Sequence, residues 1–201
     1  MKKKIAIIKF PNSNIQSVIS SLNYLGFQPE VIQDGKKLKN YGNLVIPGVG
    51  AFKAGMNFLK EKQLDKEILK FVLSGKNTLV VCLGMQILLE SSEEFGITNG
   101  LSLIKGKVKR FNQVTTNLGW KQIYLNKDKF KNNFFYFVHS YYCDLTEKNI
   151  IHSYSFNNKF KFCSSYLKNN ILGCQFHPEK SGKTGLKLIK NFFDGKNIKT
   201  L

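Results

Sequence analysis

The segment Thr78–Leu89, which reads Thr-Leu-Val-Val-Cys-Leu-Gly-Met-Gln-Ile-Leu-Leu, constrains the fold more than any other part of the chain. It begins as a short apolar run typical of a buried strand, and this run ends on Cys82. A turn containing Gly84 then leads into residues that favour a helix. A strand, a tight turn and a helix in this order lift the central side chain clear of the sheet, and the helix N-terminus favours a thiolate there. The segment therefore predicts a strand–turn–helix unit with Cys82 as a candidate nucleophile.

The first half of the chain alternates between apolar strands and amphipathic helices. The predicted strands are Lys4–Phe10, Gln28–Ile32, Asn43–Ile46 and Thr78–Val81. The predicted helices, identified by apolar residues at helical spacing, lie within Ile15–Leu25, Ala54–Leu59 and Leu64–Ser74. Short apolar strands connected by helices are typical of a parallel sheet covered on both faces.

The second half contains strands with no long helix between them. The predicted strands are Gly106–Phe111, Trp120–Leu125, Phe134–His139, Ile150–Tyr154, Phe160–Leu167 and Ile171–Phe176, and a last helix is predicted over Gly185–Phe193. Hairpins and antiparallel pairing are expected here. The whole pattern predicts an α/β fold in which residues 1–201 form one domain, with a mostly parallel central sheet extended by antiparallel strands.

The composition limits the classes of function. At 201 residues the chain can bury one well-filled core. The formal net charge is +18, but the lysines are scattered through almost every segment, so nucleic-acid binding is not expected. The four cysteines form no Cys-x-x-Cys pair and are expected to be reduced and mostly buried, as in a cytoplasmic protein. The apolar run Ile5–Ile8 is too short for a signal peptide or a spanning helix, so no membrane association is expected.

A cysteine nucleophile needs a neighbouring base, and the chain has three histidines. His177 follows a predicted strand, Pro178 restricts it to an extended conformation, and Glu179 lies two residues further on the same side. A carboxylate so placed can orient one imidazole nitrogen while the other faces Cys82. Taken alone, the stretch is more often an ordinary strand-end turn with a surface histidine.

Charge that develops on a substrate at Cys82 would need backbone N–H donors. The N–H of Leu83 is one candidate, and the turn Gly48–Gly50 is another because glycines let the backbone approach and reorient. Polar side chains that could contact a small polar substrate are Gln86, Glu94 and the run His139-Ser140-Tyr141. Taken singly, each of these polar side chains is more often a solvated or locally capped residue. A turn such as Gly48–Gly50 is usually only a loop.

Six sequence blocks together resemble the class I (triad) glutamine amidotransferases. The blocks are Pro47-Gly48-Val49-Gly50-Ala51-Phe52, Cys82-Leu83-Gly84-Met85-Gln86, Ser92-Glu93-Glu94-Phe95-Gly96, Gly119-Trp120, Tyr136-Phe137-Val138-His139-Ser140-Tyr141-Tyr142 and Gln175-Phe176-His177-Pro178-Glu179-Lys180-Ser181. They span nearly the whole chain in the family's order. The first, fourth and fifth blocks resemble one subfamily, the glutaminase subunits of imidazole-glycerol-phosphate synthase.

This resemblance implies a three-layer amidotransferase fold and hydrolysis of L-glutamine to glutamate and ammonia through a γ-glutamyl thioester. It implies that Cys82 is the nucleophile, that His177 acts as general base and then acid, and that Glu179 orients His177. It places Val49 and Leu83 in the oxyanion hole once the Val49 peptide has turned, and the glutamine contacts at Gly50, Gln86, Glu94, His139, Ser140 and Tyr141. It calls for no cofactor and no metal.

The resemblance also implies a partner subunit. A cyclase of the (β/α)8-barrel type would dock over the glutaminase site, form a heterodimer and carry the ammonia through its barrel. There the ammonia would meet a phosphoribulosyl-formimino-carboxamide ribonucleotide and give imidazole glycerol phosphate and a carboxamide nucleotide. Asn14, Trp120 and Lys180 fall on the family's interface positions.

One loop and two single residues depart from the family pattern. The first loop is Phe10-Pro11-Asn12-Ser13-Asn14, where the family has Tyr-Gly-x-Gly-Asn, so its backbone must differ. Val80 replaces a glycine two residues before the nucleophile and is expected to crowd the underside of the turn. Asn117 replaces a histidine two residues before the Gly-Trp block. The three triad residues are all present, so these departures bear on docking of a partner and on activation by it.

Two other functions fit the same residues. The altered first loop and Asn117 fit a related glutaminase that feeds ammonia to another synthase, such as one that aminates a sugar for surface polysaccharide. Val80 and the positive charge fit a binding or scaffold protein that kept the fold and lost turnover. Gene neighbourhood separates the histidine-pathway subunit from the related glutaminase. Labelling of Cys82 by an electrophilic glutamine analogue tests the scaffold hypothesis.

Overall fold

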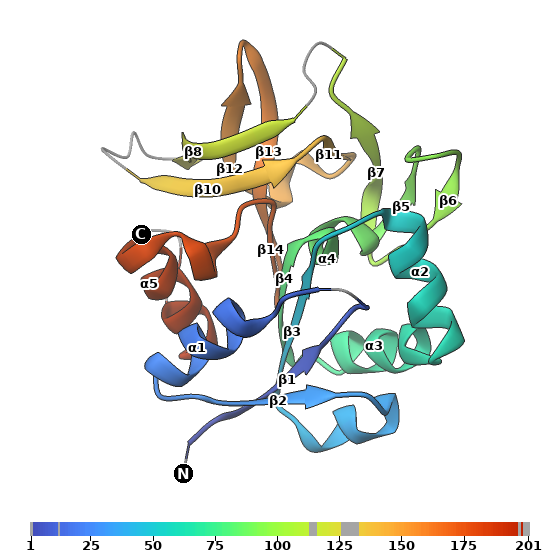
Figure 1. Ribbon diagram of the computed structural model, residues 1–201, viewed down its shortest axis with the longest axis vertical. Helices are drawn as coiled ribbons and strands as arrows, with labels where there is room; N and C mark the ends of the chain where they lie inside the picture. The colour runs from blue at the N-terminus through green and yellow to red at the C-terminus, as the bar shows by residue number, and fades with distance from the viewer. Residues whose placement is uncertain (1, 12, 113–115, 126–132, 197, 199–201) are drawn as a thin grey trace.

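The computed structural model describes residues 2–11, 13–112, 116–125, 133–196 and 198 (Figure 1). Within them the main sheet has eight strands in the order β2-β1-β3-β4-β14-β13-β12-β9. The first five run parallel and are β2 (Gln28–Ile32), β1 (Lys4–Ile8), β3 (Asn43–Gly48), β4 (Asn77–Cys82) and β14 (Ile171–Cys174). The last three add antiparallel strands and are β13 (Phe160–Lys168), β12 (Ile151–Asn157) and β9 (Tyr124–Leu125).

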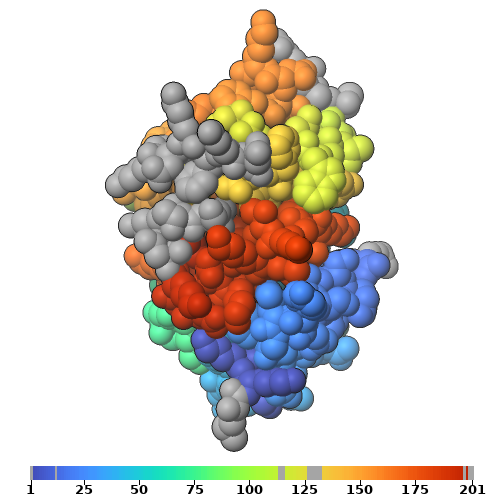
Figure 2. Space-filling view, turned by 90° about the vertical axis from the view of Figure 1, so that its left-hand side faces the viewer, coloured from blue at the N-terminus to red at the C-terminus, as the bar shows by residue number. Residues whose placement is uncertain are grey.

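Helices cover both faces of the parallel part of the sheet. On one face α1 (Gln16–Tyr24) lies beside the C-terminal helix α5 (Gly182–Phe193), as the adjoining blue and red surfaces in Figure 2 show. On the other face lie α2 (Phe52–Glu61) and α3 (Leu64–Leu73). The strand residues alternate between the two apolar clusters, so that within β1 Ile5 and Ile7 pack with α1 and α5 while Ala6 and Ile8 pack with α2 and α3. This arrangement requires strands that are apolar on both faces.

Two smaller sheets cover one end of the main sheet. We call the antiparallel pair of β8 (Asn117–Gln122) and β10 (Phe134–His139) the ribbon. The other sheet is four-stranded among the described residues and has the order β11-β7-β5-β6, with bounds Tyr141–Leu145, Ile104–Arg110, Leu89–Ser92 and Thr98–Asn99. The remaining elements are α4 (Leu83–Ile87) and the 3₁₀ helices Gly35–Asn40, Lys148–Ile150 and Pro178–Lys180.

The α/β class and the antiparallel extension of the sheet are confirmed, while several predicted boundaries are wrong. The helix predicted after Cys82 has only five residues, because Leu89 already pairs with Ile104 in β5. The strand predicted over 120–125 is divided between β8 and β9, which belong to different sheets. The sequence does not indicate β5, β6 and β11, because short strands depend on their pairing partners more than on local pattern. The four cysteines are free and buried, as expected.

No helix in the described part of the chain is both long and apolar enough to cross a membrane.

Candidate active site

Cys82 lies where the strand β4 meets the helix α4, and its backbone is strained there. Its φ of 52° and ψ of −109° lie outside the region that side-chain-bearing residues prefer, as expected where a sharp turn lifts a side chain off a sheet. Gly84 makes the turn possible, because a Cβ at that position would lie 1.8 Å from the carbonyl oxygen of Ile46 in the adjacent strand β3. The sulfur is buried, and the thiol donates to the carbonyl oxygen of Val138 at 3.9 Å.

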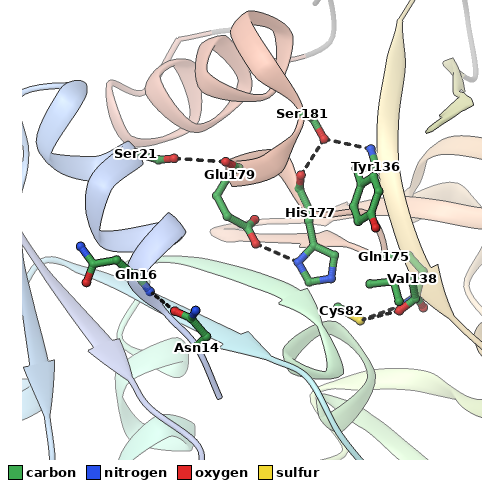
Figure 3. A network of polar contacts seen from close by, with 10 residues as sticks. All are labelled: Asn14, Gln16, Ser21, Cys82, Tyr136, Val138, Gln175, His177, Glu179 and Ser181. Carbon is green, nitrogen blue, oxygen red and sulfur yellow. Dashed lines mark hydrogen bonds and ion pairs between the residues drawn. The ribbon is translucent and has the colours of Figure 1, made fainter. Parts of the chain in front are cut away.

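His177 and Glu179 are brought to the sulfur by the strand next to β4. Because β14 pairs with β4 in parallel, the residues that follow Cys174 emerge beside Cys82. His177 Nδ1 lies 2.8 Å from Glu179 Oε1, and both side chains are almost completely buried. Figure 3 shows the imidazole between the carboxylate and the sulfur. Among described residues Nε2 of His177 has no hydrogen-bond partner, so this nitrogen is free to exchange a proton at Cys82.

The pKa of His177 reflects these neighbours. Burial lowers it, but the Cys82 sulfur and the Glu179 carboxylate both raise it and prevail, so that the pKa rises from 6.5 to about 10. An imidazolium held between a carboxylate and a sulfur can stabilise negative charge on the sulfur and donate a proton to a departing group.

A cavity of about 450 Å³ opens onto Cys82. It is lined by every residue predicted for the oxyanion hole and the glutamine contacts, namely Val49, Gly50, Leu83, Gln86, Glu94, His139, Ser140 and Tyr141. The β3 strand continues to Gly48, which pairs with Cys82, so the following turn lies at the nucleophile. Gly50 there has a φ of 114°, a conformation that favours glycine. The structure thus gathers segments that are up to about ninety residues apart in sequence.

Gln86 is fully engaged within the wall of the cavity. Its side-chain N–H groups donate to the carbonyl oxygen of Tyr141 at 3.1 Å and to Oε1 of Gln175 at 3.2 Å. Gln175 in turn points its own amide nitrogen at the Cys82 sulfur at 3.8 Å. Gln86 therefore positions the neighbouring backbone and leaves its amide oxygen for a ligand.

His139 has both ring nitrogens occupied. Nδ1 lies 2.8 Å from the Tyr141 carbonyl oxygen and Nε2 lies 2.8 Å from the amide nitrogen of Asn117. A carbonyl only accepts, so Nδ1 carries the proton and Nε2 accepts from Asn117. Burial and the charge of His177 lower the pKa of His139 to about 4 despite the opposing effect of the Tyr141 carbonyl. His139 is neutral and shapes the cavity wall, and Asn117 holds its Nε2.

Two other predicted contact residues are held by hydrogen bonds. Glu94 Oε2 accepts from the N–H of Phe52, the first residue of α2, at 2.6 Å. The Ser140 hydroxyl lies 3.1 Å from that of Thr116. Each keeps further capacity for a ligand, because a carboxylate has two oxygens and a hydroxyl both donates and accepts.

The three residues predicted at a partner interface do not line the cavity. Trp120 is more than half exposed on the ribbon, and Lys180 is exposed in the 3₁₀ helix beside Glu179. Asn14 is exposed, and its side-chain oxygen accepts from the N–H of Gln16 at 2.9 Å (Figure 3). The altered first loop is closed by Ser13, whose hydroxyl donates to the carbonyl oxygen of Phe10 at 2.7 Å, while Asn12 lies outside the described residues.

The sequence analysis does not assign four residues that lie at the site. Phe95, Arg110 and Val138 line the cavity, and Gln175 contacts the sulfur. Two of them carry a signal that could have been used. Gln175 lies two residues before His177 and therefore on the same side of an extended segment, and Arg110 is the only arginine in the chain.

Comparisons with known proteins agree with this geometry. A sequence model of the family described as glutamine amidotransferase class-I matches residues 6–195. The fold is similar to that of PurLQS from Thermotoga maritima, with a TM-score of 0.76 at 19% identity over 97% of this chain and 99% of that one. A crystal structure of a glutamine amidotransferase gives a TM-score of 0.73 at 16% identity over 95% and 98%. The chain belongs to the class I glutamine amidotransferase family and is an enzyme of glutamine hydrolysis.

Several relatives within this family carry one name. The imidazole glycerol phosphate synthase subunit HisH of Chlorobaculum tepidum is 39% identical over 94% of this chain and 98% of the relative. The HisH subunit of Methanosarcina acetivorans is 40% identical over 96% and 98%. These matches extend over nearly the full length of both proteins.

Proposed function

We propose that this chain is the glutaminase subunit of an imidazole glycerol phosphate synthase, working in histidine biosynthesis in the cytoplasm as one domain over residues 1–201. The observation that carries the proposal is the buried His177–Glu179 pair, whose free Nε2 faces the sulfur at the strained turn. The full-length similarity to HisH subunits gives the pathway.

The first half-reaction uses the charge pair at Cys82. The thiolate attacks the side-chain amide carbon of glutamine, and backbone N–H groups of Val49 and Leu83 receive the oxyanion after the Val49 peptide has turned. His177 then donates its Nε2 proton to the departing nitrogen, the C–N bond breaks, and ammonia leaves a γ-glutamyl thioester on the sulfur.

The second half-reaction restores the site. Neutral His177 takes a proton from water while the water oxygen attacks the thioester carbon. The C–S bond breaks, glutamate leaves, and the thiolate–imidazolium pair re-forms. Glu179 keeps Nδ1 of His177 in place throughout, because its side chain accepts from that nitrogen at 2.8 Å.

The outward face of the ribbon supports the proposed cyclase interface. Val138 pairs with Leu118, and Tyr136 pairs with Trp120 across the two strands. Leu118, Trp120 and Val138 are exposed on this face, and contiguous exposed apolar side chains mark interaction surfaces. The partner is therefore proposed to cover the ribbon, with Asn14 and Lys180 at the edge, and to receive ammonia directly from the cavity.

A glutaminase assay tests the proposal. Ammonia release from glutamine should be slow for the chain alone and strongly stimulated by the (β/α)8 cyclase from the same genome with its nucleotide ligand. The Trp120→Ala variant should weaken partner binding by roughly 10- to 100-fold, as for a buried aromatic interface residue, and leave the unpartnered rate unchanged. No stimulation by that cyclase, or histidine-independent growth of a deletion strain, would reject the histidine-pathway assignment in favour of another synthase.

A further inference from the structure

Arg110 is a solvent-exposed residue that lines the cavity. It is the last residue of β7, along which Ile104, Gly106 and Val108 are buried and the lysines between them are not. Because side chains alternate along a strand, Arg110 lies on the same face of β7 as these buried residues, but it is itself exposed where the strand ends. Its side chain lines the same cavity as Cys82.

The guanidinium of Arg110 has no hydrogen bond or ion pair with any residue that the structure describes. Two carboxylates close to it in the fold are engaged with backbone groups, since Glu93 accepts from the N–H of Arg110 itself and Glu94 accepts from Phe52, both at 2.6 Å. The preceding Lys109 instead pairs with Asp144 at 3.0 Å. A guanidinium is a permanent cation whose planar fork matches a carboxylate, so an unpaired one in a reactive cavity indicates an anionic ligand group.

The charges on the cavity wall match one end of an α-amino acid. Glu94 is the acidic residue of the wall and Arg110 the basic one, and Tyr141 pairs with Arg110 in the β7–β11 ladder. Glutamine carries its α-ammonium and α-carboxylate at the end remote from the amide carbon. With that carbon at the Cys82 sulfur, the charged end finds an acidic and a basic side chain, Glu94 and Arg110, on the wall of the same cavity.

We propose that the guanidinium of Arg110 binds the α-carboxylate of glutamine and thereby selects amides that carry a free α-carboxylate. The inference rests on the proposed glutaminase function. Because Arg110 holds a part of the substrate that does not react, its contribution is the same in the ground state and in the transition state. Its loss therefore raises KM and leaves kcat almost unchanged.

The test compares two substrates with Arg110→Gln, Arg110→Lys and a control variant of the cyclase-bound enzyme. For glutamine, Arg110→Gln should raise KM by roughly 10- to 100-fold, the size expected for losing a hydrogen-bonded charge pair, and Arg110→Lys should recover part of it. For 4-aminobutanamide, which lacks the α-carboxylate, wild type and Arg110→Gln should agree within about twofold in kcat/KM, or in Ki against glutamine where turnover is too slow. Lys109→Gln, on the outward row of the same strand, should leave both substrates unaffected.

The outcomes separate this inference from the proposed function. An equal loss on both substrates, or no loss on glutamine, in an otherwise active enzyme overturns the role of Arg110 alone. Wild-type protein that releases no ammonia from glutamine overturns both proposals. Unchanged thermal unfolding of Arg110→Gln is expected, because the guanidinium makes no hydrogen bond or ion pair with a described residue.

Discussion

The parallel part of the sheet and the ribbon contribute to the active site in different ways. Cys82 and His177 follow the ends of β4 and β14, two adjacent strands whose residues are buried from Thr78 and from Ile171 onward. The ribbon supplies main-chain groups: the Tyr136 carbonyl accepts from the His177 N–H at 2.8 Å, and the Val138 carbonyl accepts from the Cys82 thiol. Core packing thus holds Cys82 and His177 in place, and the ribbon at the surface contributes backbone hydrogen bonds to both residues.

This difference has a consequence for control by a partner. The strands β4 and β14 cannot shift without opening the core, which costs several kcal/mol. The ribbon carries exposed Leu118 and Trp120 on its outer side and contacts Cys82 and His177 through its backbone on the inner side. The ribbon therefore links the side proposed for the partner to backbone groups at the site.

The largest effect is expected from removing the sulfur that the core holds in place. Cys82→Ala should reduce glutamine hydrolysis by at least about 10³-fold, because no covalent intermediate can form. It should also lower the pKa of His177 from about 10, since the Cys82 sulfur raises it, and NMR titration of the imidazole measures this. A His177 pKa that stays near 10 in the variant would show that Glu179 alone holds the proton. Labelling of the wild type, but not of this variant, by an electrophilic glutamine analogue would reject the scaffold reading.

The same pKa makes a prediction for stability. The pKa of His177 is raised above the 6.5 expected in the unfolded chain, so the protonated ring stabilises the fold. This stabilisation is fully present below pH 6.5 and is lost as the pH rises through about 10. Urea unfolding of wild type and Cys82→Ala should therefore differ most at low pH and converge above pH 10. A difference that grows with pH would contradict the assignment.

The next effect concerns the residue that orients the base. Glu179→Gln should lower the rate by roughly 10²- to 10⁴-fold, because an amide neither fixes the tautomer of His177 nor stabilises its positive charge. The pH dependence of the rate should shift to lower pH, since the carboxylate is one of the groups that raise the pKa of His177. Glu67→Gln, at a surface ion pair with Lys70, is the matched control and should be neutral. A small loss with an unshifted profile would remove Glu179 from the triad.

A smaller effect tests how the ribbon positions the base. The Ser181 hydroxyl donates to the His177 carbonyl oxygen at 2.6 Å and accepts from the Tyr136 N–H at 3.0 Å (Figure 3). Ser181→Ala breaks this link and leaves a buried N–H unpaired, which should cost about 1–3 kcal/mol of stability and reduce kcat several-fold with KM unchanged. The exposed Ser20→Ala is the control. Equal kcat in wild type and Ser181→Ala would mean that the ribbon does not position His177.

The smallest effect on activity is expected at Val80. Its side chain is completely buried, and β4 keeps an unbroken register with both neighbouring strands, pairing Val80 with Ile46 and Gly173. The sheet thus accommodates the valine, so Val80→Gly should cost about 2–4 kcal/mol of stability through the cavity and the added chain freedom, with an unchanged rate. A faster glycine variant with the partner bound would show that the valine strains the turn.

The positions of Cys82 and of the His177–Glu179 pair are predictable from sequence because their geometry is local. A strand, a glycine turn and a helix specify where Cys82 stands, and Pro178 with the two-residue spacing specifies how Glu179 meets His177. The state of His139 is not predictable in this way. Its neutral form depends on burial and on the charge of His177. Its Nε2 is held by Asn117, which is 22 residues distant and reaches it only because β8 and β10 pair in one particular register.

The sequence by itself determined the α/β class, the elements of the parallel sheet and the blocks that identify the family, because these depend on periodicity and on contiguous motifs. Only the tertiary structure decided which polar groups are free. In the sequence, Glu94, Gln86 and His139 look like free ligand-binding residues. In the structure each of them already makes a hydrogen bond within the protein. Arg110 was one cation among many in the sequence, and strand pairing placed it, unpaired among the described residues, in the cavity of Cys82. Hydrogen-bond satisfaction is a property of three-dimensional neighbours, and local pattern does not encode it.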